Sequence, residues 1–218
     1  MKLTWYGHAC FGLNSESGVL LITDPYNPTH YGPSFTYALI GDEPDVVTIS
    51  HQHPDHAYPE QFARRPKVID TPGEHEFEDI DILGIPAFHD SSRGVERGAD
   101  IMFAITMDGL RVAHLGDLGA PLTPEQITAI GRSDLLMLPV GGTFTIDWRE
   151  AGDIVETLKP KITIPMHYHT DKCSFNIDGV DRFIAGKENV IKAGTTQIDV
   201  GEYVEDHPGS IVVLEHAR

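Results

Sequence analysis

The chain is poor in cysteine, in long apolar runs and in basic side chains. Cys10 and Cys173 are its only cysteines in 218 residues, so they allow one disulfide at most, and we expect free thiols in a reducing compartment. No apolar run approaches the roughly 20 residues of a membrane span. The segment Met1–His8 carries one charge and lacks the apolar stretch of a secretory signal. These absences predict a cytoplasmic protein without a membrane span.

The shortage of basic residues limits the choice of partners. Lys and Arg number 16 against 33 Asp and Glu, which gives a net charge of −17 at pH 7. Phosphate backbones attract clustered positive charge, and these basic residues are scattered, so we expect no nucleic acid partner and a small-molecule substrate. A length of 218 residues fits one domain, 1–218. The composition leaves the oligomeric state open, and a homo-oligomer is compatible with it.

Short apolar segments separated by Gly, Pro, Asn and Asp predict many strands. Thr123, Pro124 and Gln126 predict a helix start with a capping box. Further helices are expected over about 148–158, ending before Pro160, and over about 179–184. The expected strands are 2–6, 10–14, 19–23, 46–49, 67–69, 80–85, 101–106, 110–114, 135–139, 161–164 and 211–214. This pattern predicts an α/β protein with two sheets packed face to face and helices outside.

The densest cluster of chemical groups is Ser50–His56, directly after the apolar segment Val46–Ile49. It holds three histidines and an aspartate, and a divalent cation compensates for the desolvation of so many polar groups. If the strand continues through His51 and His53, both side chains point the same way and can bind one ion. The turn at Pro54 would then direct the next two side chains to a second ion. The alternative is a solvated histidine-rich turn.

Three more candidate ligands follow apolar strands further along the chain. His89 ends the stretch Gly84–His89, Asp117 follows the strand 110–114, and His167 ends the stretch Ile162–His167. Residues at strand ends commonly project into a site. Two neighbouring ions would need a bridging carboxylate and additional imidazoles, and these positions supply them.

Together these residues resemble the metallo-β-lactamase fold superfamily of metal-dependent hydrolases over nearly the whole chain. The segments Trp5–Cys10, Pro72–Glu74, His114–Asp117 and Ile164–Tyr168 are similar to a narrower branch. That branch is related to ascorbate phosphate lactonases and to enzymes that cleave N-acyl phosphatidylethanolamines. The resemblance implies a four-layer αββα sandwich of two mixed β-sheets flanked by helices.

The resemblance also implies two divalent metal ions and a ligand set for each. Zn²⁺ fits the imidazole and carboxylate ligands, and Mn²⁺ or Fe²⁺ fit as well. His75 competes with His89 for a place at the first ion, and the resemblance favours His89. The implied ligands are His51, His53 and His89 for one ion, Asp55, His56 and His167 for the other, and Asp117 as the bridge.

These ligands imply hydrolysis by a metal-bridging hydroxide. Such an enzyme would act on a small or medium substrate, a phosphoester or a lactone-type ester, and Asp55 would orient the water and later carry a proton to the leaving group. A non-catalytic metal-binding protein is the alternative, although structural zinc sites are usually closed and rich in thiolate. A nuclease is a third hypothesis, which the acidic net charge of the chain disfavours.

Several other residues are candidates for supporting roles. Asp24 corresponds to an aspartate of the resembling family that orients a ligand histidine, or it caps a turn before Pro25. His8 lines the pocket or is a buried structural histidine. We expect His114 to be structural rather than functional, since strand alternation turns it away from Asp117. Gly141 permits a close backbone approach or a turn with positive φ.

The loops that would set specificity carry no recognisable motif. Arg93 and Arg97, in the segment 91–98, are the cations near the expected site. A solvated loop is their plain interpretation, and binding of an anionic substrate is the other.

Overall fold

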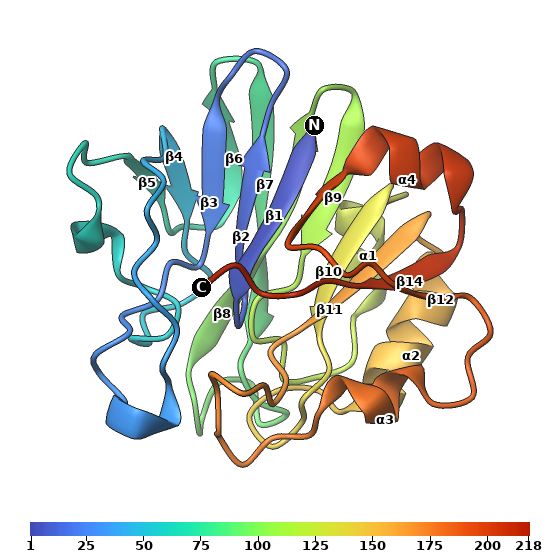
Figure 1. Cartoon of the computed structure of the whole chain (residues 1–218). Helices are drawn as coiled ribbons and strands as arrows, with labels where there is room; N and C mark the ends of the chain where they lie inside the picture. The colour runs from blue at the N-terminus through green and yellow to red at the C-terminus, as the bar shows by residue number, and fades with distance from the viewer.

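Two mixed β-sheets packed against each other dominate the computed structural model, which describes residues 1–218 (Figure 1). In spatial order, the six-stranded sheet contains β13 (Gln197–Asp199), β1 (Lys2–Gly7), β2 (Cys10–Asn14), β3 (Leu20–Thr23), β4 (Val46–Thr48) and β5 (Lys67–Ile69). The eight-stranded sheet contains β12 (Val190–Lys192), β14 (Ser210–Val213), β11 (Ile162–Met166), β10 (Leu135–Pro139), β9 (Leu110–His114), β8 (Ala99–Met107), β7 (Ile80–Phe88) and β6 (Gly73–Phe77). The predicted fold class is confirmed.

Strand direction explains where the polar side chains gather. In the first sheet β1 and β3 are both antiparallel to β2, and β4 is parallel to β3, so the three run the same way. In the second sheet β7 and β9 are both antiparallel to β8, and β10 and β11 are parallel to β9. The carboxyl ends of these strands therefore lie at one edge of each sheet, the usual place for a site in α/β folds.

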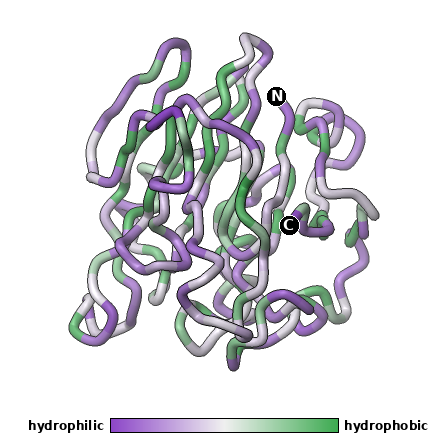
Figure 2. Tube along the Cα trace, turned by 60° about the vertical axis from the view of Figure 1, so that its left-hand side comes forward, coloured by the Kyte–Doolittle hydropathy of each residue, from purple (hydrophilic) through white to green (hydrophobic).

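Both faces of the central strands β2, β3 and β4 are buried, and their side chains alternate between two apolar clusters. Leu21 and Val46 belong to the large cluster between the sheets, whereas Ile22 and Val47 belong to a smaller cluster on the outer face. Figure 2 shows apolar stretches along the central strands and hydrophilic outlying loops. The strands accordingly read as continuous apolar runs, as expected for strands covered on both sides.

The two sheets are covered differently. Helices α1 (Pro124–Ile130) and α2 (Trp148–Leu158) pack against the eight-stranded sheet, and α3 (Val180–Ile184) packs against α2. Over the six-stranded sheet lie two connections, the one from β3 to β4 with the short 3₁₀ helix η1 (Gly32–Ser34) and the one from β4 to β5 with η2 (Pro59–Gln61). Both connections contribute buried aromatic side chains to the smaller cluster, so they cover the sheet without an α-helix.

Local signals predicted the helix ends well. Thr123 forms the expected capping box with Gln126, and α2 covers the predicted residues and ends with Lys159 in the left-handed conformation before Pro160. The prediction lacked β6, β12, β13 and α4 (Val200–Asp206).

No helix in the structure is long and apolar enough to traverse a lipid bilayer.

Candidate metal centre

Histidines and aspartates follow the strands that end at the common edge. His8 follows β1, Asp24 follows β3, His89 follows β7 and His167 follows β11. The two sheets meet here, since the His167 backbone N–H donates to the His8 carbonyl at 3.3 Å and the Ile101 N–H to the Ser50 carbonyl at 2.9 Å. The fold thus brings distant residues to one place by means of strand direction alone.

The expectation that a strand delivers His51 and His53 is wrong. Strand β4 ends at Thr48, and Ser50–His56 forms a series of bends and turns. The N–H groups of His56 and Ala57 both donate to the His53 carbonyl at 2.9 Å, which closes a tight turn. The two imidazoles still converge, with His51 Nε2 and His53 Nδ1 only 2.9 Å apart. A turn, and not strand periodicity, therefore brings the His51 and His53 imidazoles together.

The expected ligands form three groups, in each of which the potential ligand atoms lie within 4.8 Å of one another. His53 belongs to the first of these groups only, whereas His51 and His56 each belong to two of them. The groups are His51, His53 and His89; His51, His56 and Asp117; and His8, Asp55, His56 and His167. His8, expected either to line the pocket or to be a buried structural histidine, is fully buried and lies among the candidate ligands themselves.

Asp117 lies at the centre of the three groups. Its Oδ2 is 3.3 Å from Nε2 of His56 and 3.3 Å from Nε2 of His89. The same oxygen is 3.2 Å from His167 Nε2 and 4.0 Å from His51 Nε2. One carboxylate oxygen thus faces imidazoles of every group, as a bridging ligand would.

The electrostatics of the centre keep Asp55 and Asp117 ionised and keep His8 and His51 neutral. Burial and the nearby His56 lower the pKa of His51 to about 4, and burial and His167 lower the pKa of His8 to about 4. Burial opposes ionisation of Asp117, but His167 and His56 outweigh it and hold the pKa of Asp117 well below its usual range. Metal ligands must be neutral imidazoles and ionised carboxylates, so the directions at His8, His51 and Asp117 favour a cation. Although His56 is buried, Asp117 and Asp55 raise its pKa well above the usual range, so this imidazole must lose a proton when an ion binds.

The hydrogen-bonding groups of the centre are also incompletely satisfied by the protein. His56 Nε2 and Asp117 Oδ1 are buried without a hydrogen-bond partner, as are both ring nitrogens of His8. Buried polar atoms in native proteins normally have a partner. Divalent metal ions would satisfy atoms of this chemistry, so the residues present fit the metal centre that the sequence predicts.

Asp24 holds the turn Ser50–His56 in place through its side-chain carboxylate. Its carboxylate accepts hydrogen bonds from Ser50 N–H and Ser50 Oγ–H, both at 2.7 Å, and lies 2.9 Å from His56 Nδ1. This contact leaves His56 Nε2 free to face Asp117. The geometry is that of a carboxylate that orients a metal-binding imidazole.

Asp100, in β8, is a site residue that the sequence analysis did not identify. It is fully buried, and its Oδ1 lies 3.4 Å from His51 Nδ1 and accepts a hydrogen bond from the Asp117 N–H at 3.3 Å. Burial, Asp117 and Asp24 together raise the pKa of Asp100 to about 8. A polar residue at the start of an otherwise apolar strand was the available signal.

His114 and His75 lie outside the three groups. The buried His114 Nε2 is 2.9 Å from the Ala9 carbonyl, and its Nδ1 accepts a hydrogen bond from the Gly116 N–H at 3.2 Å. His75 lies on β6 with Nε2 2.9 Å from the Thr71 carbonyl. His114 thus joins β9 to the first hairpin, and His89 rather than His75 faces Asp117.

Two glycines allow strand-end backbones to approach closely. A Cβ on Gly141 would lie 2.3 Å from the His167 carbonyl oxygen, and a Cβ on Gly119 would lie 2.3 Å from the His89 carbonyl carbon. Gly142, not Gly141, has the positive φ, at +65°. Gly119 was not predicted, because a single sequence does not distinguish a glycine needed for close backbone contact from a glycine in an ordinary turn.

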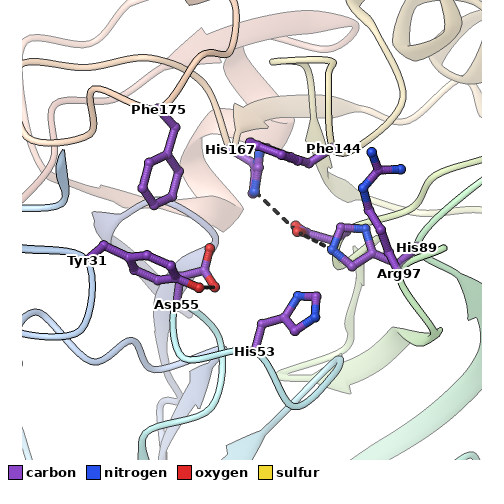
Figure 3. A pocket seen from close by; sticks show the side chains of 9 residues that line it. Tyr31, His53, Asp55, His89, Arg97, Phe144, His167 and Phe175 are labelled. Atoms are coloured by element: carbon purple, nitrogen blue, oxygen red, sulfur yellow. Dashed lines mark hydrogen bonds and ion pairs between the residues drawn. The ribbon is translucent and has the colours of Figure 1, made fainter.

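The centre opens into a cavity of about 460 Å³. Figure 3 shows His53, His89 and Arg97 on one side of it and Tyr31 and Phe175 on the other. Tyr31 Oη–H donates to Asp55 Oδ1 at 3.0 Å. The cavity is lined by Tyr31, His53, Asp55, His89, Arg97, Asp117, Phe144, His167 and Phe175. A small molecule entering it would meet the candidate metal ligands directly.

Comparisons with known proteins agree with this geometry. The Beta-lactamase superfamily domain matches residues 2–167. A UPF0173 metal-dependent hydrolase of Thermoplasma acidophilum is 32% identical over 201 residues, covering 78% of this chain and 84% of that protein. A UPF0173 metal-dependent hydrolase of Methanoculleus marisnigri is 31% identical over 193 residues, covering 78% and 82%.

Solved structures show the same fold. A Thermotoga maritima protein assigned to the Zn-dependent hydrolases of the metallo-β-lactamase superfamily superposes with a TM-score of 0.77 and 36% identity, covering 99% of this chain and 98% of that one. The metallo hydrolase Igni18 of Ignicoccus hospitalis has a TM-score of 0.67 at 23% identity, covering 99% and 94%. With its fold, its cluster of histidines and aspartates and these relatives, the chain belongs to the metal-dependent hydrolases of the metallo-β-lactamase superfamily.

Proposed function

We propose that this protein is a dinuclear metal-dependent hydrolase of a small or medium substrate, a phosphoester or a lactone-type ester. The observation that carries the proposal is the position of Asp117 Oδ2, within 3.3 Å of Nε2 of His56, His89 and His167. His51, His53 and His89 would hold one ion, Asp55, His56 and His167 the other, and Asp117 both. Zn²⁺ suits these ligands, as do Mn²⁺ and Fe²⁺.

The ions, when bound, would lower the pKa of a shared water toward about 7 and polarise an oxygen of the substrate. Asp55 is ionised, since His56 and His8 outweigh its burial and depress its pKa far below the usual range. Tyr31 donates to Asp55 Oδ1, and His8 Nε2 lies 3.3 Å from Oδ2. These contacts fix a carboxylate at the wall of the cavity, where it can orient the attacking water and take its proton.

Access to the cavity favours catalysis over a structural metal site. His53, Asp55, His89, Asp117 and His167 all line the cavity, so a bound substrate would reach both proposed ions. A structural site is usually closed by four protein ligands and is rich in thiolate. Both cysteines are buried away from the three groups. The expected cytoplasmic location and single domain remain predictions.

The test is a metal-reconstituted protein assayed on phosphomonoesters, phosphodiesters and lactones. Wild type should bind two ions per chain by elemental analysis and turn over at least one substrate class. Asp55→Asn should lower kcat by about 10²–10⁴-fold, because it removes the proton acceptor. Asp153→Asn, on the exposed face of α2, should behave as wild type. Two bound ions without turnover of any member would refute the hydrolase proposal.

The two buried aspartates that contact candidate ligand histidines, Asp24 and Asp100, should respond to replacement by asparagine to different extents. Asp24 is ionised, because His56 overcomes the effect of burial on its pKa, and it accepts from two Ser50 donors. An amide cannot accept all of these bonds, so Asp24→Asn should weaken metal binding by about 10–100-fold. With its pKa raised to about 8, Asp100 is mostly protonated at pH 7, so Asp100→Asn should cost less.

Isothermal titration with Zn²⁺ at pH 7 measures both affinities. His56→Ala combined with Asp24→Asn should bind no more weakly than His56→Ala alone, because Asp24 acts through that imidazole. Additive losses in the double variant, or a larger loss from Asp100→Asn than from Asp24→Asn, would contradict this assignment.

A further inference from the structure

Arg97 is the one permanently cationic side chain among the nine that line the cavity. This position is notable in a chain of net charge −17. Its guanidinium lies beside His89 and Phe144 in Figure 3. The other formal charges at the wall are those of Asp55 and Asp117, which two divalent ions would more than offset. With the metal centre loaded, Arg97 would therefore add a second positive position at the wall, separate from the candidate ligands.

The loop that carries Arg97 is anchored to the metal centre. Asp90, directly after His89, is buried, and its carboxylate accepts four backbone hydrogen bonds of 2.8–3.0 Å. The His89 N–H also donates to the Gly98 carbonyl at 3.1 Å, which closes the base of the loop. The donors to Asp90 are the N–H groups of Ser92, Gly94, Glu96 and Arg97. The backbone of Arg97 is thus held at a fixed position.

The guanidinium itself has free donors. Its Cζ lies 5.8 Å from the centroid of the Phe144 ring, which supports it from one side. Its ion pair with Glu96 is long, at 3.6 Å, and both side chains are substantially exposed. Exposed pairs of this kind contribute little free energy. A planar guanidinium supported on an aromatic ring is well suited to bind a carboxylate or phosphate through two parallel hydrogen bonds.

The opposite wall is aromatic. Tyr31 and Phe175 pack edge to face with their centroids 5.1 Å apart, and Phe175 stacks on the buried Phe35 at 5.6 Å. The hydroxyl of Tyr31 is engaged by Asp55, so its ring, rather than its polar end, is available to the cavity. The two walls differ in character, and the candidate metal ligands lie between them.

We propose that the substrate carries, besides the bond that is cleaved, an anionic group that binds Arg97 and an apolar group that packs against Tyr31 and Phe175. The anion is a carboxylate or a phosphate. This inference rests on the proposed hydrolytic function, because it orients the substrate across the same centre. It makes Arg97 and Phe175 determinants of specificity.

The catalytic test uses esters that differ only in a distal charge. The monoesters of 4-nitrophenol with succinate, glutarate and adipate are compared with 4-nitrophenyl butyrate on the metal-loaded protein. At least one anionic ester should show a kcat/KM above that of the butyrate ester by about 10-fold or more, a gain typical of a charge-assisted hydrogen bond. Arg97→Gln should abolish this ratio, and Arg97→Lys should restore part of it. Arg93→Gln, on an exposed residue of the same loop, should leave it unchanged.

Binding measurements separate this inference from the hydrolase proposal. By titration calorimetry, glutarate or 4-phosphonobutyrate should bind the metal-loaded wild type more tightly than butyrate, and the stronger of the two identifies the anion. Phe175→Ala should reduce the preference for 2-phenylsuccinate over succinate by about 5-fold. If neither these esters nor the phosphoester and lactone panel is turned over but glutarate binding still depends on Arg97, the hydrolase proposal fails and Arg97 is retained as an anion-binding residue. If neither the ester ratio nor anion binding changes in Arg97→Gln, the inference is overturned.

Discussion

Replacing Asp117 with asparagine is expected to cause the largest loss of function of any single substitution in this chain. Its Oδ2 faces His56, His89 and His167 at 3.2–3.3 Å, so it serves both proposed ions. An amide bears no charge, and its nitrogen cannot coordinate. We expect the metal content to fall from two ions to one or none, and turnover to fall by about 10³-fold or more, since the polarising cations supply several kcal/mol of transition-state stabilisation.

The variant should also be less stable without metal. Asp117 is the main partner that keeps the pKa of the buried His56 well above its usual range, and removal of one partner from a buried charge pair leaves the other uncompensated. Elemental analysis, calorimetric titration and thermal unfolding of apo protein measure these effects. Asp81→Asn, on an exposed position of β7, is the matched control. Retention of two tightly bound ions by Asp117→Asn would refute the bridging role.

The sequence predicted the location of the site because the ligands follow strands. Apolar segments that end in His89, Asp117 and His167 are local features, and β7, β9 and β11 run in the same direction. Strand order and direction were not predicted from the sequence, and the expectation that these residues share one site came from their positions after strands and from the family resemblance. The structure supplies the direction that brings their side chains to one edge.

Other features depend on tertiary contacts that no local pattern encodes. The turn geometry of Ser50–His56 comes from Asp24, which binds Ser50 across 26 positions of sequence. The role of Asp100 depends on the neighbouring positions of His51 and Asp117 in space. The aromatic wall of the cavity joins Tyr31 and Phe175, which are far apart in the sequence. Periodicity and spacing carry no information about such pairs.

The backbone at the centre is strained by positive φ angles that the sequence did not predict. His8, Asp24 and His167 have φ values of +53°, +41° and +50°. Non-glycine residues in this left-handed region cost about 1–3 kcal/mol each unless the surroundings impose it. Three such residues at one edge, all beside the candidate ligands, indicate that the fold fixes these side chains before any metal binds.

Substituting alanine for Gly141 tests whether this fixed backbone matters. The added Cβ would lie 2.3 Å from the His167 carbonyl oxygen and 3.2 Å from Ile177 Cβ. The first contact is with backbone, so the chain that presents His167 must move. We expect a loss of about 1–3 kcal/mol in the free energy of unfolding, or a Tm lower by about 2–12 °C for a chain of this size. Displacement of the His167 imidazole should also lower the affinity for the second proposed ion and leave the affinity for the first unchanged.

Gly152→Ala is the matched control, because it adds the same methyl group in a permissive place. Gly152 lies inside α2, and its Cβ would have only Lys187 Nζ nearby, at 3.9 Å. Alanine in a helix interior is favoured over glycine by about 0.5–1 kcal/mol, so this variant should unfold at a higher temperature and keep both ions. Chemical denaturation and calorimetric metal titration compare the two variants. Equal stability and equal metal affinity in Gly141→Ala and wild type would show that the strand-end backbone tolerates displacement, and the argument that a rigid edge positions His167 would fail.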